Sequence, residues 1–266
     1  MKIAFIGGGN MGEVIISALL DKGLSTPDSI RVSDIKDERR QYLKQAYGVA
    51  VAGDNRAVAA EGEVVVLAVK PQNLTEVMAE LNGRLKPDQL VLSIIAGARM
   101  DTLRRGLGHN AVVRAMPNTP AKIRQGVSVW TATDEVTAPQ KAQAGAILGA
   151  MGGEFYVAEE KYLDMATAVS GSGPAYVFLF VEALTEAAVK IGLPQDMASE
   201  LVMQTLLGSG GYLQKSGRAP AELRQMVTSP GGTTAEALAR FEQGGFKELV
   251  LAAVEAAYEK AQKLGG

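Results

Sequence analysis

The sequence of 266 residues contains no cysteine and a single histidine. Without cysteine, the chain cannot form disulfide bonds, a thiolate nucleophile or a cysteine-ligated metal site. The histidine, His109, lies in the segment Gly106–Asn110, which we interpret as a turn, and a histidine in a loop is usually solvated. One histidine also provides no metal-binding cluster. We therefore expect no metal site and no acid–base catalysis by histidine or cysteine.

The chain also lacks a large charge of one sign and long apolar runs. Its formal net charge of −2 gives no reason to expect a nucleic acid or an anionic membrane surface as a partner. The most apolar run, Ala175–Val181, is far too short to span a bilayer. The first strand begins at the second residue, so we expect no secretory signal peptide. These features predict a soluble, cytoplasmic protein that binds neither nucleic acid nor membrane.

The chain opens with an apolar strand that ends at Ile6 and runs into the pattern G-x-G-x-x-G, from Gly7 to Gly12. In dinucleotide-binding proteins the first glycine, here Gly7, allows the tight turn, and the second, Gly9, lets the backbone approach the pyrophosphate. Gly12 lets the next helix pack close to the strand, and the N-terminus of that helix attracts the anion. A glycine-rich turn alone is weak evidence, but the strand before it and the amphipathic helix after it favour a dinucleotide site.

Strand and helix patterns alternate through the first part of the chain. Helical patterns such as Glu38–Tyr47 and Leu74–Leu81 lie between apolar segments, which predicts crossover connections and a parallel sheet. Continuous apolar runs suit strands that are covered on both faces. The predicted strands are residues 2–6, 30–34, 49–52, 64–69, 90–95 and 111–116, followed by 126–132 and 154–157 with a helix between them.

From about residue 160 the strand patterns stop, and alanine-rich helical patterns continue to the end. We therefore predict an α/β Rossmann-like domain over residues 1–159 and an all-helical domain over residues 160–266. The second domain contains Val177–Val181, which is apolar on every face, and a helix of that kind is normally buried. A helical domain of this size has little material to cover it, so we predict burial against a second subunit. Burial within the monomer is the alternative.

An acidic residue follows the second predicted strand, about where the adenosine ribose of a dinucleotide is expected. Asp34 would accept hydrogen bonds from a ribose 2′-hydroxyl and would repel a 2′-phosphate, which favours NAD. Lys36, Arg39 and Arg40 lie just beyond it and could offset that repulsion. A solvated charged turn is the alternative interpretation, and the sequence leaves NAD and NADP open.

The chain lacks the lysine that an alcohol dehydrogenase of similar layout would use. In hydroxyacid dehydrogenases with a two-part organisation, a lysine follows a G-x-G by four residues, and an amide follows four residues later. Counted from Gly171-x-Gly173, those positions hold Val177 and Val181. A secondary alcohol is therefore a poor candidate substrate, because its oxidation needs a general base. An imine is the better acceptor, since a protonated C=N bond is already electrophilic and the cofactor carries the hydride.

The segment Ser229–Thr234 supplies what an imine with a carboxylate group needs. Gly231 and Gly232 leave backbone N–H groups free to converge on a carboxylate, at the start of a predicted helix over Ala235–Glu242. Thr234 lies in the first turn of that helix, from which its hydroxyl could reach the imine nitrogen. Helix capping next to a glycine turn is the alternative interpretation.

Six segments follow one another along almost the whole chain in a recognisable order. Five of them are FIGGGNMG at residues 5–12, AVKPQ at 68–72, SIIAG at 93–97, RAMPNTPA at 114–121 and SGSGPAY at 170–176. The sixth is the stretch of residues 220–242 around SPGGTT at 229–234. Together they resemble the pyrroline-5-carboxylate reductase family, for which the last segment is the signature region.

This resemblance implies the reduction of 1-pyrroline-5-carboxylate to L-proline with NADPH or NADH, the last step of proline biosynthesis. It also implies a Rossmann-like N-terminal domain and an all-α C-terminal dimerisation domain. The expected assembly is a homodimer, which in this family often associates further into a decamer, a pentamer of dimers. The expected partner is the small-molecule substrate.

The resemblance implies roles for individual residues by position. Expected cofactor residues are the pyrophosphate turn Ile6, Gly7, Gly8, Gly9, Asn10, Met11 and Gly12; the ribose positions Asp34 and Lys36; Asn55, Ala68, Val69, Lys70 and Pro71; and, on the nicotinamide side, Ala96, Gly97 and Asn118. Expected substrate residues are Glu160, Ser229, Gly231, Gly232, Thr233 and Thr234. Thr234 is the expected catalytic residue, with its hydroxyl on the ring nitrogen, and Glu160 could favour the iminium form of the substrate.

Two of these positions need comment. Pro71 holds Lys70 in an extended backbone conformation, so we expect the main chain of Lys70 to serve the cofactor and its ammonium group to be solvated. Asp34 departs from the neutral residue that many members carry there, and this leaves the choice between NADH and NADPH open. Whether Thr234 donates a proton or only positions the substrate is open as well.

Two alternative functions remain for the residues read so far. The first is a reductase of another cyclic imine, or of a different small acid, on the same fold. The second is a nucleotide-sensing or interaction protein, which would bind the cofactor without turnover. The second alternative leaves the Ser229–Thr234 turn unexplained.

Overall fold

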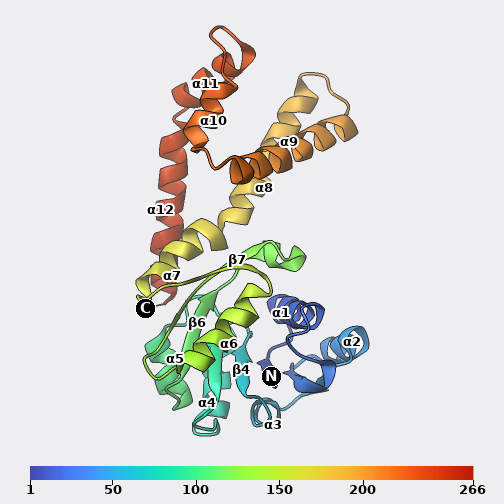
Figure 1. Ribbon diagram of the computed structural model, residues 1–266, viewed down its shortest axis with the longest axis vertical. Coiled ribbons are helices and arrows are strands. Elements are labelled where there is room, and N and C mark those ends of the chain that lie inside the picture. The colour runs from blue at the N-terminus through green and yellow to red at the C-terminus, as the bar shows by residue number, and fades with distance from the viewer. Residues whose placement is uncertain (266) are drawn as a thin grey trace. The chain divides into compact units, whose positions relative to one another are not determined.

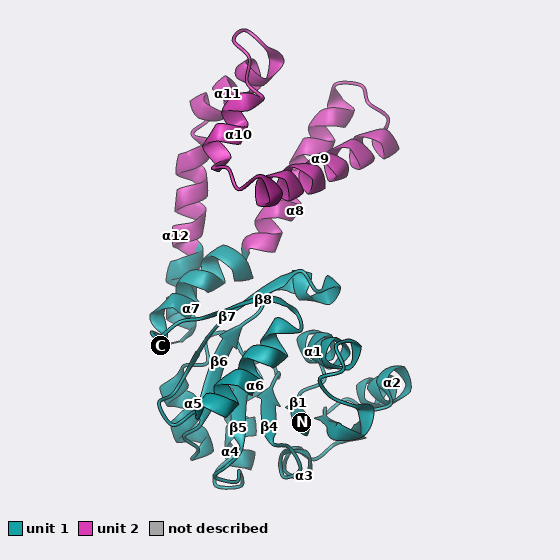
Figure 2. Ribbon diagram, in the orientation of Figure 1, with its two compact units in different colours: residues 1–172, 257–266 teal, residues 173–256 magenta. Residues whose placement is uncertain are grey.

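The computed structural model describes residues 1–265 and contains two compact units (Figure 2). One unit comprises Met1–Ser172 together with the C-terminal residues from Ala257 onward, and the other comprises Gly173–Ala256. The two units divide between Ser172 and Gly173, within the helical part of the chain. The domain boundary expected between residues 159 and 160 stays a prediction.

The first unit is built on one eight-stranded sheet with the strand order β3-β2-β1-β4-β5-β6-β7-β8. Figure 1 shows this sheet among the helices of the unit, with β4, β6 and β7 labelled. β1 to β6 pair in parallel, β7 runs antiparallel to β6, and β8 runs parallel to β7. The strands are β1 Ile3–Ile6, β2 Ile30–Ser33, β3 Ala50–Ala52, β4 Val64–Leu67, β5 Leu90–Ser93, β6 Val112–Met116, β7 Gly126–Ala132 and β8 Gly152–Tyr156. The predicted Rossmann-like α/β architecture is therefore confirmed.

Helices connect the strands, as the alternating sequence pattern predicts. Those of the first unit are α1 Asn10–Asp21, α2 Asp37–Tyr47, α3 Asn55–Ala59, α4 Leu74–Leu81, α5 Met100–Leu107, α6 Ala138–Gly149 and α7 Lys161–Ala166, with 3₁₀ turns η1 Pro27–Ser29, η2 Pro71–Asn73 and η3 Thr119–Ile123 and a π-helical turn η4 Thr167–Gly171. The remaining helices are α8 Gly173–Lys190, α9 Gln195–Ser216, α10 Pro220–Met226, α11 Thr233–Gln243 and α12 Phe246–Leu264, whose last residues belong to the first unit.

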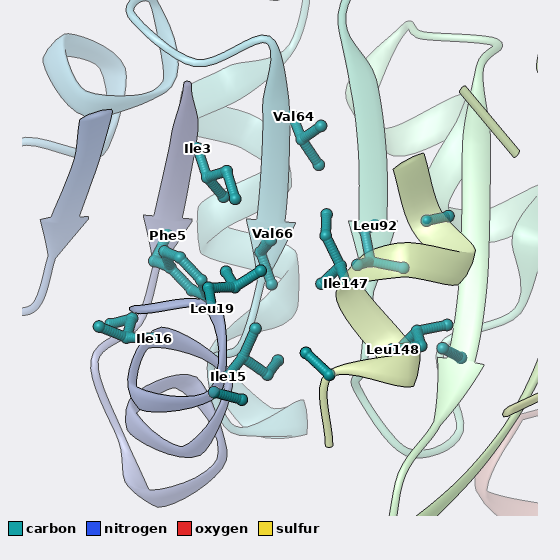
Figure 3. Packing of buried hydrophobic residues seen from close by; sticks show 14 of the residues in the cluster. Ile3, Phe5, Ile15, Ile16, Leu19, Val64, Val66, Leu92, Ile147 and Leu148 are labelled. Atoms are coloured by element: carbon teal, nitrogen blue, oxygen red, sulfur yellow. The ribbon is translucent and has the colours of Figure 1, made fainter. Parts of the chain in front are cut away.

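The sheet is buried on both faces. Successive side chains of a strand point to opposite sides, and an apolar cluster covers each side. Ile3 and Phe5 of β1 belong to one apolar cluster with residues of α1, α2 and α6. Figure 3 shows Phe5 beside Leu19 of α1, and Ile147 of α6 beside Leu92 of β5. Ala4 and Ile6 pack in a second cluster with α3, α4 and α5. Loops lie at the carboxyl ends of the strands, and open α/β sheets bind their ligands at that edge.

Some predicted segments differ from the observed ones in length. β4 ends at Leu67, and not at Val69, because the chain turns out of the sheet there: the N–H of Ala68 still donates to Ile6 at 2.9 Å, but ladder pairing stops.

The expectation that His109 is solvated is wrong. Its side chain is 6% exposed, and Nε2 lies 2.8 Å from the carbonyl oxygen of Gln89, so this histidine serves the packing beneath the sheet.

The helices α8 and α9 expose large apolar side chains. α8 has no buried residue, and Phe178 and Leu179 are 64% and 65% exposed. The alternative of burial within the monomer is therefore wrong for Val177–Val181. The helical stretch Lys161–Lys190 has the length and the mean hydropathy, 1.2, of a membrane-spanning helix, and 6% of its most apolar window is buried. By length and composition alone this is weak evidence for a membrane, because helices that pack in soluble proteins meet the same criteria.

Candidate active site

The three glycines of the opening turn each have a distinct structural reason. Gly7 has a φ of +99°, and a Cβ there would lie 2.8 Å from the carbonyl carbon of Ala68. A Cβ on Gly12 would lie 2.7 Å from the Gly7 oxygen, so only glycine allows α1 to pack this close to β1. A Cβ on Gly9, by contrast, would meet no atom within 4 Å. Space is thus kept open at Gly9, where the backbone of such turns meets a pyrophosphate.

The N-terminus of α1 adds hydrogen-bond donors to this space. Gly9 is the N-cap residue, with φ −66° and ψ −172°, and the first bond inside the helix runs from Glu13 N–H to Gly9 O at 2.9 Å. The amides of Asn10, Met11 and Gly12 precede that bond, as the free donors of a helix N-terminus do. A backbone cradle with open space and unpaired amides fits an anionic dinucleotide.

The loops after the parallel strands bring most of the expected cofactor residues to one edge of the sheet. Because β1 to β6 are parallel, their carboxyl ends meet there, and the order in which successive strands are added to the sheet reverses between β1 and β4. The residues that follow β1, β2, β3, β4, β5 and β6 at this edge include Ile6–Gly12, Asp34, Lys36, Asn55, Ala68–Pro71, Ala96, Gly97 and Asn118.

Three of these residues use their side chain or their shape inside the fold. Asn118 is 8% exposed; its amide donates to Ser170 O at 3.0 Å and its oxygen accepts from Val127 N–H at 2.9 Å. Asn55 donates to Glu80 at 2.7 Å. Gly97 has a φ of +76°, and a Cβ there would lie 2.6 Å from the carbonyl oxygen of Leu264. The two asparagine side chains brace the loops and Gly97 allows a close approach to Leu264, so contacts of these residues with a cofactor would come from their backbone.

Lys70 and Pro71 have the geometry that the sequence predicts. Lys70 is extended, with φ −68° and ψ 147°, and its side chain is exposed. Pro71 then begins the 3₁₀ turn η2. The ammonium group of Lys70 is therefore free to be solvated, and a role of the main chain toward the cofactor stays a prediction.

A second cluster, not expected from the sequence, joins α1 to α2. Glu13 accepts hydrogen bonds from the hydroxyls of Tyr47, at 2.8 Å, and Tyr42, at 3.0 Å, and forms an ion pair with Arg39. Burial alone would raise the pKa of Glu13, but the hydrogen bonds from Arg39, Tyr47 and Tyr42 outweigh burial and hold it below its ordinary value. Burial, followed by the bond to the Glu13 carboxylate, raises the pKa of Tyr47 to about 12.

Stability contributed by Glu13 should depend on pH. Because the folded-state pKa of Glu13 lies below the unfolded one, its stabilisation is present above the unfolded pKa and is lost as pH falls through the folded pKa. We expect Glu13→Gln to lower the free energy of unfolding at pH 7, and the difference from wild type to shrink between about pH 5 and pH 3. Urea denaturation across this range measures it, with Glu38→Gln, at an exposed position of α2, as the control. A difference that stays constant with pH would contradict the expectation.

Glu160, expected next to the substrate, is bound within a network of charges. Its Oε1 accepts from the Met100 N–H at 2.9 Å, at the N-terminus of α5, and from Arg114 at 2.7 Å. Arg114 also pairs with Asp164 at 3.1 Å, and Asp164 pairs with Arg99 at 2.8 Å. The network ties α7 to β6 and to the loop after β5 that carries the expected nicotinamide contacts. Sequence reasoning missed it, although a lone arginine in an otherwise apolar strand was a usable signal.

Removing the shared acid of this network should be costly to stability. Arg114 and Asp164 have side chains only 4% and 5% exposed, and Asp164→Ala leaves the buried guanidinium of Arg114 with one partner fewer. We expect Asp164→Ala to lower the free energy of unfolding by about 3 kcal/mol. The measurement is urea denaturation at a fixed protein concentration. Asp101→Ala breaks an exposed pair with Arg105 and should cost under about 1 kcal/mol; equal effects for the two variants would contradict the argument.

The turn before α11 presents a helix N-terminus and a hydroxyl. Gly231 has a φ of +69°, and Gly232 is the N-cap of α11, without a side-chain capping bond. The N–H of Gly232 donates to Ser229 O at 3.0 Å, so the expectation that this amide is free is wrong. The donors that precede the first bond of the helical ladder, from Glu236 N–H to Gly232 O at 3.2 Å, are those of Thr233, Thr234 and Ala235. The alternative interpretation, helix capping next to a glycine turn, agrees with Gly232 as the N-cap, and no side chain forms a capping hydrogen bond there.

The hydroxyl of Thr234 is available for a ligand. Within residues 1–265 it has no hydrogen-bond partner, although Thr234 is partly shielded from solvent. Thr228, two residues before Pro230, bonds instead to Arg224 O at 2.6 Å. A free hydroxyl beside the free amides of a helix N-terminus can hold a carboxylate and a nitrogen of one small molecule.

Comparison with known proteins decides the family. The family model described as "Pyrroline-5-carboxylate reductase dimerisation" matches residues 160–264, and the model described as "NADP oxidoreductase coenzyme F420-dependent" matches residues 2–97. Over 265 residues, the chain is 41% identical to the pyrroline-5-carboxylate reductase of Synechocystis, which covers 100% of this chain and 98% of that protein. The chain belongs to the pyrroline-5-carboxylate reductase family.

Solved structures of pyrroline-5-carboxylate reductases share the fold over their whole length. The enzyme from Coxiella burnetii has a TM-score of 0.92 and 39% sequence identity, with 100% of this chain and 98% of that chain covered. The pyrroline carboxylate reductase of Plasmodium falciparum, solved with NADP bound, has a TM-score of 0.90 and 31% identity, with the same coverage. These likenesses confirm the predicted family, its NAD(P)-dependent oxidoreductase class and the predicted fold class. The roles of individual residues stay predictions.

Proposed function

We propose that this pyrroline-5-carboxylate reductase family member reduces 1-pyrroline-5-carboxylate to L-proline, with NADPH or NADH as the hydride source. The observation that supports the substrate is the N-terminus of α11, where free backbone amides and the free Thr234 hydroxyl lie together. A small ring with a carboxylate and an imine nitrogen needs that pair of groups. Bound at the glycine turn, the dinucleotide would supply a hydride.

The residues of the cofactor half bind and orient. The amides of Asn10, Met11 and Gly12 would hold the pyrophosphate, over the space that Gly9 keeps open. Ala68–Pro71 follow the carboxyl end of β4, and Ala96–Gly97 follow that of β5; these two strands come next to β1 in the sheet. We assign the nicotinamide side to these loops, because ligands of open α/β sheets lie across this edge.

The residues of the α11 turn hold the acceptor. The N–H groups of Thr233 and Thr234 would bind the carboxylate, and the hydroxyl of Thr234 would accept from the N–H of the protonated imine or donate to the imine nitrogen. Hydride adds to the carbon of the C=N bond, and the nitrogen keeps the proton of the iminium, which gives the secondary amine of proline. Orientation and charge stabilisation are sufficient for this step, because the iminium is already electrophilic.

Initial rates with 1-pyrroline-5-carboxylate, measured side by side with NADH and NADPH, test the activity. A panel of cyclic imines with six- and seven-membered rings, each with a carboxylate, tests the substrate. We expect turnover of the five-membered ring to exceed that of the larger rings. Faster turnover of another imine would show that this imine is the substrate. Cofactor binding without any turnover would show that the protein is a nucleotide sensor.

We propose that the exposed apolar faces of α8 and α9 are covered in a homodimer, and that dimers assemble into a pentamer of dimers in the cytoplasm. The family's dimerisation model matches this part of the chain, and Phe178, Leu179 and Leu207 are more than 60% exposed in the single chain. Apolar exposure on this scale marks an interface. Light scattering after size exclusion distinguishes monomer, dimer and decamer, and recovery in the membrane fraction would contradict the cytoplasmic assignment.

A further inference from the structure

The carboxylate of Asp34 is fixed against the glycine turn. Its Oδ2 accepts from the N–H of Gly8 at 3.0 Å, and its Oδ1 accepts from the N–H of Lys36 at 2.9 Å. A carboxylate has about four acceptor positions, so two remain for other donors. A vicinal pair of ribose hydroxyls provides donors of that kind, and the adenosine ribose of a dinucleotide lies at the end of this second strand. The negative charge cannot turn away from a ligand there without breaking two backbone hydrogen bonds.

The two arginines that could offset this charge are held by other acids. Arg39 donates through Nε to Gly8 O and pairs with Glu13, and its guanidinium lies 4.9 Å from the ring centre of Tyr42. Arg40 donates to the carbonyl oxygen of Asp34 at 2.6 Å and pairs with Asp37 at 2.9 Å. Both arginines are thus paired with acids, whereas Lys36, whose side chain is exposed, has no ion pair among the described residues.

We propose that Asp34 makes this chain selective for a dinucleotide with a free 2′-hydroxyl, NADH, and that Glu13 is a positioning residue that keeps Arg39 away from a 2′-phosphate. A 2′-phosphate at this ribose would meet the fixed carboxylate of Asp34, whereas a 2′-hydroxyl would donate to it. The selectivity contrasts with the Plasmodium falciparum relative, whose structure holds NADP. It rests on the cofactor site proposed above.

Binding of two adenosine fragments tests the proposal without turnover. Calorimetric titration of the full-length protein with 5′-AMP and with 2′,5′-ADP, at one ionic strength, compares ligands that differ by the 2′-phosphate alone. We expect wild type to bind 5′-AMP at least about 10-fold more tightly, because like charges at contact distance repel strongly where water is partly excluded. Equal or tighter binding of 2′,5′-ADP would overturn the selectivity. Failure of both fragments and of NADH to bind would overturn the cofactor site itself.

Substitution of Asp34 assigns the effect. Asp34→Ser should shift the affinity ratio toward 2′,5′-ADP by about 30-fold or more, since it removes the repulsion and leaves a hydroxyl donor. Asp28→Ser makes the same charge change at an exposed position before β2 and should leave the ratio unchanged. An unchanged ratio in a folded Asp34→Ser protein, or an equal shift in Asp28→Ser, would overturn the role of Asp34.

Glu13 is tested in the Asp34→Ser background. Adding Glu13→Gln releases Arg39 from its ion pair, so 2′,5′-ADP should bind a further several-fold more tightly while the affinity for 5′-AMP stays the same. If Glu13 had a purely structural role, its substitution would weaken the binding of both fragments alike, and this outcome would overturn its positioning role. The ratio of kcat/KM for NADH and NADPH should follow the fragment affinities in all these variants.

Discussion

Thr234→Ala should lower kcat by about 100-fold at saturating cofactor, which corresponds to about 2.7 kcal/mol of transition-state stabilisation. The hydroxyl has no partner inside the described chain, so its removal leaves no buried group unsatisfied and should not disturb α11. The substrate carboxylate would still bind the amides of Thr233 and Thr234, which the substitution keeps. We therefore expect KM to change much less than kcat, as is typical when a contact is stronger in the transition state. Initial rates over a range of 1-pyrroline-5-carboxylate concentrations measure both constants.

Two variants control this prediction. Thr228→Ala makes the same chemical change a few residues earlier, at a hydroxyl that bonds to Arg224, and should leave kcat within a few-fold of wild type. Thr234→Ser keeps the hydroxyl and should retain much of the activity. A kcat for Thr234→Ala within a few-fold of wild type would show that this hydroxyl is not the partner of the imine nitrogen.

Gly9→Val should weaken cofactor binding by about 100-fold, or about 2.7 kcal/mol, without unfolding the protein. Its φ of −66° suits any residue, and a Cβ there meets no atom of the chain within 4 Å. The new side chain would instead fill the space that the backbone leaves to the pyrophosphate. Fluorescence titration with NADH measures the affinity, and urea denaturation without cofactor measures stability.

The neighbouring glycines behave differently, and this separates packing from binding. Gly7→Ala would place a Cβ 2.8 Å from Ala68 at a φ of +99°, so we expect it to lose stability as well as binding. Gly153→Val, at an exposed position of β8, should change neither. A Gly9→Val protein that binds NADH like wild type would place the pyrophosphate elsewhere.

Much of the fold could be predicted because its signals are local. The strand β7 was expected at its observed bounds, residues 126–132, and the G-x-G-x-x-G turn lies between β1 and α1 as its spacing requires. Apolar runs mark strands that are covered on both faces. The glycine pattern marks a turn whose backbone conformation or close contacts exclude a side chain. The strand ends were less certain, because the residue at which the chain leaves the sheet depends on its neighbours, as at Leu67.

The site was predicted in outline but not in its hydrogen bonding. The sequence placed a carboxylate at Asp34 and cations beyond it, but not which acid each cation pairs with. Likewise it marked Gly232 as a free amide, whereas the folded turn bonds that amide to Ser229. The burial of His109 depends on Gln89, 20 positions earlier in the chain. No local pattern encodes such pairs.

By itself, the sequence determined the class of molecule: a glycine turn after a buried strand, a parallel sheet, a helical second part and a second glycine turn before a helix. These follow from periodicity and from backbone restrictions that act within a few residues. Only the tertiary structure decided which charges are free. Asp34 meets Gly8 across 26 positions and Arg114 meets Glu160 across 46, and such partners are chosen by the packing of the whole sheet. Selectivity between two dinucleotides depends on those pairings, because a cation that is already paired offers little to a phosphate.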